Sequence, residues 1–233
     1  MNILITGASR GLGYELAAEA LERGHAVIAG ARGGGSVKLA KLSEEYGGGD
    51  RLAIAELDVT DEAGIQALAA KLKQEGRTLG AIINNAAILN ARDTQIEDLD
   101  MADVAATFEI NLYGPMRVAK HFLPLLTEEN AAFFNISSES GCITNAYPGD
   151  YPYSISKTAL NMFSEQLHRY LRPRGVQVLS IHPGWIKTDM GSERAPGDPR
   201  ASARGILDLL ERRVVPENHR FRFVDFTGKE LPI

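Results

Sequence analysis

The sequence predicts an α/β fold in which a single domain carries a parallel sheet covered by helices on both faces. Short apolar runs alternate with longer stretches of helical periodicity along all 233 residues, which is the pattern of strands joined by crossover helices. The runs are mostly apolar, as strands buried on both faces tend to be. No internal repeat, low-complexity segment or long linker divides the chain. One domain is therefore the simplest organisation.

The expected elements follow one another in strict alternation. Seven apolar runs are the expected strands, at 2–6, 26–31, 52–57, 81–84, 132–137, 176–181 and 220–224. The stretches with helical periodicity are 12–23, 36–46, 61–75, 99–126, 153–172 and 200–213.

Residues at the element boundaries agree with this division. Thr60 precedes two acidic residues and is the expected N-cap of the third helix. Pro173 and Gly175 are expected to end the helix over 153–172. The stretch 189–199, DMGSERAPGDP, is rich in glycine, proline and charge and predicts a mobile loop. It follows the carboxyl end of a strand, where open α/β sheets bind ligands.

Composition narrows the class of protein. Hydrophobic residues make up 44% of the chain and charged residues 24%, which is ordinary for a globular domain. A net charge of −5 argues against nucleic acid or an anionic membrane as the main partner, and no apolar run approaches the roughly 18 residues of a membrane span. The N-terminal apolar residues are interpreted as a strand, not as a signal peptide. Cys142 is the only cysteine, so no intrachain disulfide forms and a cytoplasmic location is expected; we interpret it as a packing residue, and no metal site is predicted.

The first strand runs directly into the turn TGASRGLG at 6–13. Amide groups at a helix start, together with the helix dipole, favour a bound phosphate, and glycine lets a pyrophosphate approach the backbone. The spacing of Gly7, Gly11 and Gly13 is GxxxGxG, which departs from the GxGxxG dinucleotide fingerprint. A tight strand-to-helix turn without a ligand is the alternative.

Five further motifs accompany this turn in a fixed order: NNA at 84–86, Asn111, NISS at 135–138, YSISK at 153–157 and HPG at 182–184. With them the chain resembles the short-chain dehydrogenase/reductase family over nearly its whole length. The stretches HPGWIKTDMG and FTGKELPI are most similar to the branch that contains sniffer-type carbonyl reductases and the myxobacterial C-factor. The resemblance implies a doubly wound Rossmann-type domain with a mostly parallel seven-stranded sheet.

Tyr153 and Lys157 lie four residues apart, so on a helix they share a face. A tyrosine that protonates a carbonyl oxygen needs its pKa lowered from about 10, and a shift of ~3 requires about 4 kcal/mol. An ammonium at ~4 Å supplies about this much at an effective dielectric constant of ~20. The alternative is a solvated pair on a helix surface. Tyr151 competes for the role but precedes Lys157 by six residues.

The resemblance assigns two more catalytic residues. Ser138, near the end of the fifth strand, would hydrogen-bond the substrate carbonyl and stabilise the developing charge; Ser137 is its competitor. Asn111 matches the helix asparagine that helps to hold a water beside the lysine in a proton relay. A helix kink in which Asn111 bonds backbone is a compatible alternative.

The expected cofactor is NADP(H). Ala31 stands where NAD-dependent relatives usually carry an acid, and Arg32 follows it with a guanidinium that can pair with a 2′-phosphate; Arg10 would add a second charge. A bare surface arginine is the alternative for Arg32, and the three glycines after it predict a flexible loop. The cofactor contacts implied by the resemblance are Gly7, Ser9, Arg10, Gly11, Leu12, Gly13, Arg32, Asp58, Val59, Asn85, Ala86, Tyr153, Lys157, Pro183, Gly184 and Thr188.

Within this set, Asp58 would accept a hydrogen bond from the adenine amino group. Ala87 departs from the family, which usually has glycine there, and its methyl group could crowd the cofactor. Trp185 and His182 are interpreted as packing residues.

Together these features predict an enzyme that reduces an aldehyde or ketone with NADPH. An NAD-dependent alcohol dehydrogenase and a cofactor-binding signalling protein are the alternatives. The segments 139–150 and 189–199 would form the walls of the substrate site, although neither specifies the substrate. The helices over 99–126 and 153–172 could pair between subunits, as in relatives, to form a homodimer or homotetramer.

Overall fold

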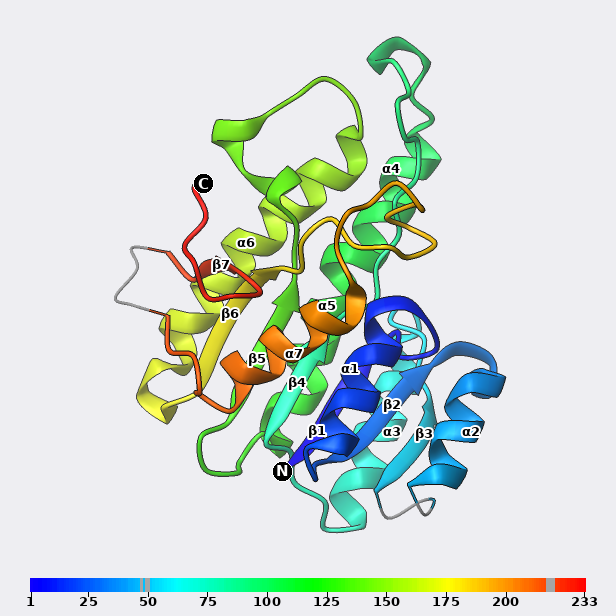
Figure 1. The fold of residues 1–233 in the computed structure, drawn as a ribbon, viewed down its shortest axis with the longest axis vertical. Coiled ribbons are helices and arrows are strands. Elements are labelled where there is room, and N and C mark those ends of the chain that lie inside the picture. The colour runs from blue at the N-terminus through cyan, green and yellow to red at the C-terminus, as the bar shows by residue number, and fades with distance from the viewer. Residues whose placement is uncertain (47, 49–50, 217–220) are drawn as a thin grey trace.

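Seven strands form one sheet in the computed structural model, which describes residues 1–46, 48, 51–216 and 221–233. Every neighbouring pair of strands is parallel, in the order β3-β2-β1-β4-β5-β6-β7 (Figure 1). The predicted α/β class and seven-stranded sheet are confirmed. The strands are β1 (Asn2–Thr6), β2 (Ala26–Ala31), β3 (Leu52–Glu56), β4 (Ala81–Asn84), β5 (Ala132–Ile136), β6 (Gln177–His182) and β7 (Phe223–Asp225).

Helices cover both faces of this sheet (Figure 1). One layer contains α1 (Gly11–Glu22), α2 (Val37–Glu45) and α7 (Pro199–Leu210). The other contains α3 (Glu62–Gln74), α5 (Gly114–Phe122) and α6 (Tyr151–Leu171), with α4 (Met101–Phe108) beside α6. Because the central strands are buried on both sides, their side chains alternate between two separate cores: Ile3 and Ile5 of β1 pack with α1, whereas Leu4 packs with α3 and α5.

The chain winds away from the centre of the sheet in two directions, since β1 lies between β2 and β4. This is the topological switch point, and the loops that leave the carboxyl ends of the strands on either side of it enclose a crevice. The glycine-rich turn after β1 and the segment after β4 therefore face each other across the predicted ligand site.

The long helix predicted over 99–126 is divided. Its residues form α4, a π-helical segment over Glu109–Tyr113, α5 and a short 3₁₀ turn that contains Pro124. A π-helical segment widens the helix by one residue and is frequent at functional sites. Here it contains Asn111, one of the predicted catalytic residues.

Two helix boundaries differ from the prediction. The N-cap of α3 is Asp61, whose side chain accepts a 3.1 Å hydrogen bond from the Gly64 amide. The prediction of Thr60 was wrong because Thr60 donates both its amide and its hydroxyl group to Asp58. The helix predicted over 153–172 begins two residues earlier, at Tyr151.

Near the C-terminus, α7 ends at Leu210, three residues before the predicted end at 213. A 3₁₀ turn that contains Pro173 follows α6, and Gly175 closes it with φ 68°. Pro199, predicted as the last residue of a loop, instead belongs to α7, and Asp198 caps that helix. The seventh strand lies at Phe223–Asp225, and position 220 of the predicted strand is outside the described residues.

Candidate active site

A cavity of about 940 Å³ opens at the carboxyl ends of the strands. It is lined by residues from the segments that follow β1, β2, β3, β4, β5 and β6, and by the first turns of α6. The predicted site residues on its wall are Gly7, Ser9, Arg10, Gly11, Leu12, Arg32, Asp58, Val59, Asn85, Ala86, Ser138, Tyr153, Lys157, Pro183, Gly184 and Thr188. The fold thus brings together positions from the whole length of the sequence. Of the predicted set, Gly13 and Asn111 lie behind this wall.

The turn before α1 has the features of a phosphate cradle. Arg10 occupies the N-cap position without a side-chain cap, and the first turn carries no acid, so the amide groups that lack intrahelical partners face the cavity uncompensated. Gly7 has a φ of 66°. At Gly13 a Cβ would lie 2.2 Å from the Gly7 carbonyl oxygen, so glycine there allows helix and turn to touch. These residues fit the pyrophosphate of a dinucleotide.

Asn85 holds this turn from the neighbouring strand. Its side-chain amide donates to the carbonyl oxygens of Thr6 and Gly7, each at 3.1 Å. In return the Thr6 hydroxyl accepts hydrogen bonds from the amides of Asn85 and Ala86. Ala87, where the family usually has glycine, also lines the cavity. The segment after β4 therefore supports the cradle, and its backbone faces the same space.

The end of β2 presents one arginine to the cavity. Ala31 is buried and Arg32 is exposed on the cavity wall. The glycine loop that follows is anchored, because the amides of Gly33 and Gly34 donate to the Glu56 carboxylate at 3.0 and 2.7 Å. The loop predicted to be flexible therefore has fixed contacts close to Arg32.

Asp58 lies near Arg32 with one carboxylate oxygen already engaged. Its Oδ1 accepts hydrogen bonds from the Thr60 amide at 2.9 Å and hydroxyl at 2.8 Å. Burial opposes ionisation, but these bonds and the charge of Arg32 lower the pKa of Asp58. The ionised carboxylate keeps Oδ2 free to accept a further hydrogen bond, as an adenine amino group would donate.

Tyr153 and Lys157 share one face of α6 near the end of β5, where Lys157 is buried and Tyr153 is half-buried. The Ser138 hydroxyl lies close enough to the Tyr153 phenol to lower the pKa of Tyr153, in opposition to burial. The Lys157 ammonium donates to the Ile136 carbonyl oxygen at 2.8 Å and lies 5.5 Å from the centre of the tyrosine ring. Gly141 permits this arrangement, since a Cβ there would lie 2.9 Å from the Lys157 backbone.

The lowered pKa expected for Tyr153 is not found. Burial raises the pKa of Tyr153 to about 12, although the Ser138 hydroxyl opposes the shift. Burial also lowers the pKa of Lys157 to about 7. Loss of hydration disfavours the charged form of each group, and it is the largest cause of both shifts. The simple estimate from Coulomb attraction omitted this burial.

The two serines of the NISS motif have different surroundings. Ser137 donates to the Asn161 side chain at 2.7 Å, and Ser180 donates to the same oxygen at 2.5 Å. Ser137 is thus bound within a buried polar network between β5, β6 and α6. Of the two serines, Ser138 is the one that lowers the pKa of Tyr153. The geometry favours Ser138 as the residue that meets a substrate, whereas Tyr151 does not line the cavity.

Asn111 joins the π-helical segment to the loop after β4. Its Oδ1 accepts from the Ile88 amide at 2.9 Å, and its Nδ2 donates to the Ile88 carbonyl oxygen at 2.9 Å. The same Nδ2 lies 3.1 Å from the Ser156 hydroxyl of α6. The kinked-helix interpretation of Asn111 describes these contacts, while its part in a proton relay remains a prediction.

The rest of the cavity has walls from three segments. The predicted segment 139–150 contributes Glu139, Ser140, Asn145, Tyr147 and Asp150, and the predicted loop contributes only Asp189, Met190 and Gly191. The third segment, after β4, was missed: it supplies Ile88, Leu89 and Arg92. No signal in the sequence marked these residues, because an Asn-Ala-Arg-Asp stretch is ordinary in a loop.

Trp185 was wrongly interpreted as a packing residue. It is 51% exposed, lines the cavity and donates its indole N–H to the Gly191 carbonyl oxygen at 2.6 Å. The ring therefore braces the start of the loop after β6. His182 is mostly buried and its Nδ1 accepts from the Glu139 amide, in agreement with a packing role. Cys142 is buried too, and burial raises the pKa of its thiol.

The loop after β6 has several contacts with the rest of the domain. Its Asp189 forms a 3.0 Å ion pair with Arg10 of the glycine turn, and Gly197 exchanges backbone hydrogen bonds with Trp185 and Lys187. Both side chains of the ion pair are largely exposed, so this contact contributes little to stability.

Comparison with known proteins agrees with this geometry, since the family described as short chain dehydrogenase matches residues 1–198. The chain belongs to this family. The chain is 38% identical over 153 residues to the C-signal of Myxococcus xanthus. The matched residues cover 65% of this chain and 90% of that protein. The carbonyl reductase Sniffer of D. melanogaster has a TM-score of 0.89 at 29% identity, covering 100% of this chain and 99% of that one.

A carbonyl reductase from chicken fatty liver, solved with NADPH bound, has a TM-score of 0.86 at 30% identity over 100% of this chain and 98% of that chain. The predicted family and branch are confirmed, and the protein is an oxidoreductase of that family. In the described residues we find neither a helix with the length and apolar character to cross a membrane nor three or more acidic, histidine or cysteine side chains grouped to hold a metal.

Proposed function

We propose that this short-chain dehydrogenase uses NADPH to reduce an aldehyde or a ketone to an alcohol. The observation that carries the proposal is the meeting of Ser138, Tyr153 and Lys157 on the wall of the cavity that also contains the phosphate cradle. The carbonyl reductase from chicken fatty liver, similar over the whole chain, has NADPH bound.

Different residues of the chain would bind different parts of the cofactor. The amides of the glycine turn would hold the pyrophosphate, Arg32 would pair with the 2′-phosphate, and Asp58 would accept from the adenine amino group. At the other end, Pro183 and Gly184 would shape the backbone around the nicotinamide, Thr188 would bond its carboxamide and Lys157 would hold its ribose. When bound, the nicotinamide supplies the hydride.

The proton comes from the protein. Ser138 and Tyr153 bind the carbonyl oxygen of the substrate, and Tyr153 transfers its phenolic proton to that oxygen as the carbon receives the hydride. Ser138 stabilises the negative charge that develops there. Lys157, whose pKa burial lowers to about 7, exchanges protons near neutral pH and can restore the phenol. The enclosed site also aligns donor and acceptor.

The direct test is a panel of aldehydes and ketones, with the oxidation of NADPH followed optically and NADH run in parallel. Tyr153→Phe removes the proton donor and little volume, so we expect turnover to fall by ~10²-fold or more with cofactor binding unchanged. Tyr151→Phe, in the same turn of α6 but off the cavity wall, is the matched control. Unchanged turnover in Tyr153→Phe would contradict the assigned role.

Similarity to the C-signal of Myxococcus xanthus favours one other candidate, a cofactor-binding signalling protein. Such a protein would bind NADPH without turning over any carbonyl compound of the panel. A protein that turns over with NADH alone would instead be an NAD-dependent alcohol dehydrogenase.

A further inference from the structure

The loop after β4 presents Arg92 to the cavity from a constrained backbone. The residues on either side, Ala91 and Asp93, both adopt left-handed conformations with φ 52° and 57°. Such backbone is unfavourable for residues other than glycine, and it occurs often at ligand-binding sites. The backbone of Ile88 in the same loop is held by both polar atoms of the Asn111 side chain. Arg92 therefore projects from a loop with a fixed point close by.

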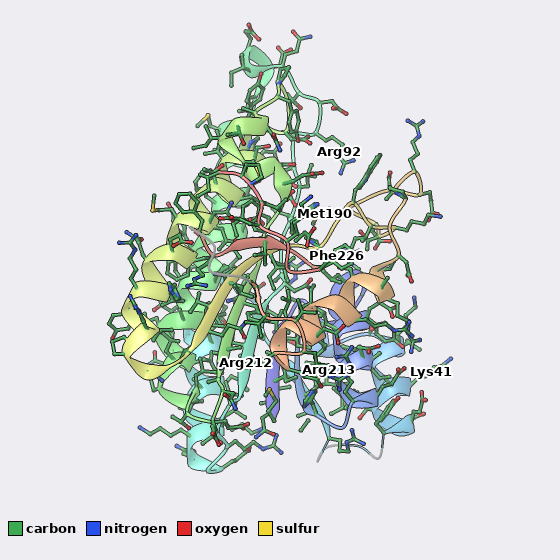
Figure 2. The ribbon with its side chains drawn as sticks, turned by 60° about the vertical axis from the view of Figure 1, so that its left-hand side comes forward. Lys41, Arg92, Met190, Arg212, Arg213 and Phe226 are labelled. Atoms are coloured by element: carbon green, nitrogen blue, oxygen red, sulfur yellow. The ribbon has the colours of Figure 1, made fainter. Side chains whose placement is uncertain are left out.

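The guanidinium of Arg92 connects two walls of the cavity. Its Nη2 donates to the Met190 carbonyl oxygen at 2.7 Å, so the loop after β4 meets the loop after β6 at this point. Figure 2 shows Arg92 and Met190 near each other in the upper half of the view, whereas Arg212 and Arg213 lie in the lower half. A guanidinium has five N–H donors, and the contact with Met190 is the one hydrogen bond that its side chain makes among the described residues.

The charge of Arg92 is not balanced by a carboxylate. Among the described residues it forms no ion pair, whereas Arg10, on the same wall, is paired with Asp189 at 3.0 Å. Of the acids on the same wall, Asp189 pairs with Arg10, Asp150 accepts from the Tyr147 hydroxyl at 3.0 Å, and Glu139 lies 3.9 Å from His182. A positive charge thus stays available on the cavity wall.

The charge of Arg92 also acts on Tyr153, the predicted proton donor. Arg92 is among the groups that oppose the raised pKa of Tyr153, so it lies within electrostatic reach of the phenol. Arg32 likewise has no carboxylate partner among the described residues, and it acts on Asp58. The cavity therefore has one unpaired arginine at the adenosine end and another near Tyr153.

We propose that Arg92 binds an acidic group of the substrate, so that the preferred substrate is an aldehyde or ketone that also carries a carboxylate or a similar oxyanion. This inference rests on the proposed carbonyl reduction for the position of the substrate. The planar fork of a guanidinium matches two oxygens of an oxyanion, and such charge-assisted bonds are the strong ones. With Nη2 on Met190, the other donors can meet the oxyanion while Ser138 and Tyr153 hold the carbonyl oxygen.

The kinetic test compares two substrates that differ in one charge, 4-carboxybenzaldehyde and its methyl ester. The parent protein is expected to reduce the acid with the higher kcat/KM. In Arg92→Gln, kcat/KM for the acid falls by about 10- to 150-fold, the loss of a charged hydrogen bond, and that for the ester stays the same. Arg194→Gln is the matched control, because Arg194 is exposed on the same loop as Met190 but does not line the cavity.

A binding arm separates this inference from the proposed function. Calorimetry with the protein loaded with NADP⁺ compares benzoate with benzamide, neither of which can be reduced. We expect benzoate to bind more tightly to the parent, and Arg92→Gln to remove that preference while Arg194→Gln keeps it. If neither aldehyde is reduced but benzoate binding depends on Arg92, the proposed reduction fails and the anion site stands. Equal losses for benzoate and benzamide, or no preference in the parent, would overturn the anion site and leave Arg92 as a tie between loops.

Discussion

Lys157 shows how burial governs a single residue in this site. Its ammonium has one hydrogen-bond acceptor, the Ile136 carbonyl oxygen, and otherwise apolar or neutral surroundings within the protein. Removal from water without a paired carboxylate disfavours the charged form. A lysine that loses its charge near pH 7 is useful for proton exchange, and its titration makes the stability of the fold depend on pH.

The sign of that dependence can be predicted. Burial lowers the pKa of Lys157 from 10.5 in the unfolded chain to about 7 in the folded one, so between these values the unfolded state holds one more proton. The free energy of unfolding therefore rises with pH from 7 to 10, by at most about 1.4 kcal/mol per pH unit. Tyr153, with its pKa raised to about 12, acts in the opposite direction only above pH 10.

Urea unfolding of the protein without cofactor at pH 7.5, 8.5 and 9.5 measures this effect. Lys157→Met should flatten the rise relative to the parent, because the titrating group is gone. Lys41→Met, which removes an exposed lysine of α2, should keep it (Figure 2). Parallel pH profiles for the parent and Lys157→Met would show that Lys157 titrates alike in both states.

Arg32 is the residue on which cofactor choice is predicted to depend. A charge-assisted hydrogen bond to the 2′-phosphate is worth about 10- to 150-fold in affinity, so Arg32→Ala should weaken NADPH by that order and leave NADH nearly unchanged. Higher salt should weaken NADPH more than NADH in the parent. Dissociation constants at two ionic strengths test both statements, with Arg212→Ala as control because Arg212 does not line the cavity. Equal weakening of both cofactors would remove the main support for NADP.

Among the helices and strands, the features that depend on neighbouring residues in the sequence were predicted correctly. Strand and helix order followed from apolar periodicity, and the four-residue spacing placed Tyr153 and Lys157 on one face of α6. The division of the predicted 99–126 helix was missed because it depends on distant atoms: Asn111 bonds the backbone of Ile88 in another loop. Arg92 was missed for the same reason, since its contact with Met190 spans 98 positions. Contacts between loops leave no periodic signal.

The two hydrogen bonds between the Asn111 side chain and the Ile88 backbone are expected to be important for both stability and activity. Asn111→Ala leaves the amide and carbonyl groups of Ile88 without their partners, at a cost of about 1–3 kcal/mol in the free energy of unfolding. Because Leu89 and Arg92 follow in the same loop, kcat/KM should fall as well. Thr107→Val is the control, since the Thr107 hydroxyl is buried on α4 and donates only to Asp103 of its own helix. The hypothesis fails if the two variants unfold alike.

For the whole molecule, the two helical layers have different outer surfaces. The layer with α5 and α6 exposes several large apolar side chains near α4: Met101, Met116, Ile155, Met162 and Tyr170. α4 and α6 are in contact, so Met101, Ile155, Met162 and Tyr170 lie on neighbouring helices, and Met116 lies on α5 of the same layer. Extended apolar surface of this kind is typical of interfaces between subunits. It lies on the helices that the sequence predicted to pair between copies.

We expect the protein to form at least a homodimer through this surface. Met162 is 63% exposed on α6, and in a dimer Met162→Glu would bury a carboxylate without a partner, which is strongly unfavourable. Light scattering coupled to size-exclusion chromatography should therefore give twice the mass of one chain or more for the parent, and a shift towards the monomer for Met162→Glu. Val37→Glu places the same charge on α2, in the opposite layer, where Val37 is 74% exposed, and should leave the mass unchanged. A parent protein that elutes as a monomer would refute this interface, and equal dissociation by both variants would place it elsewhere.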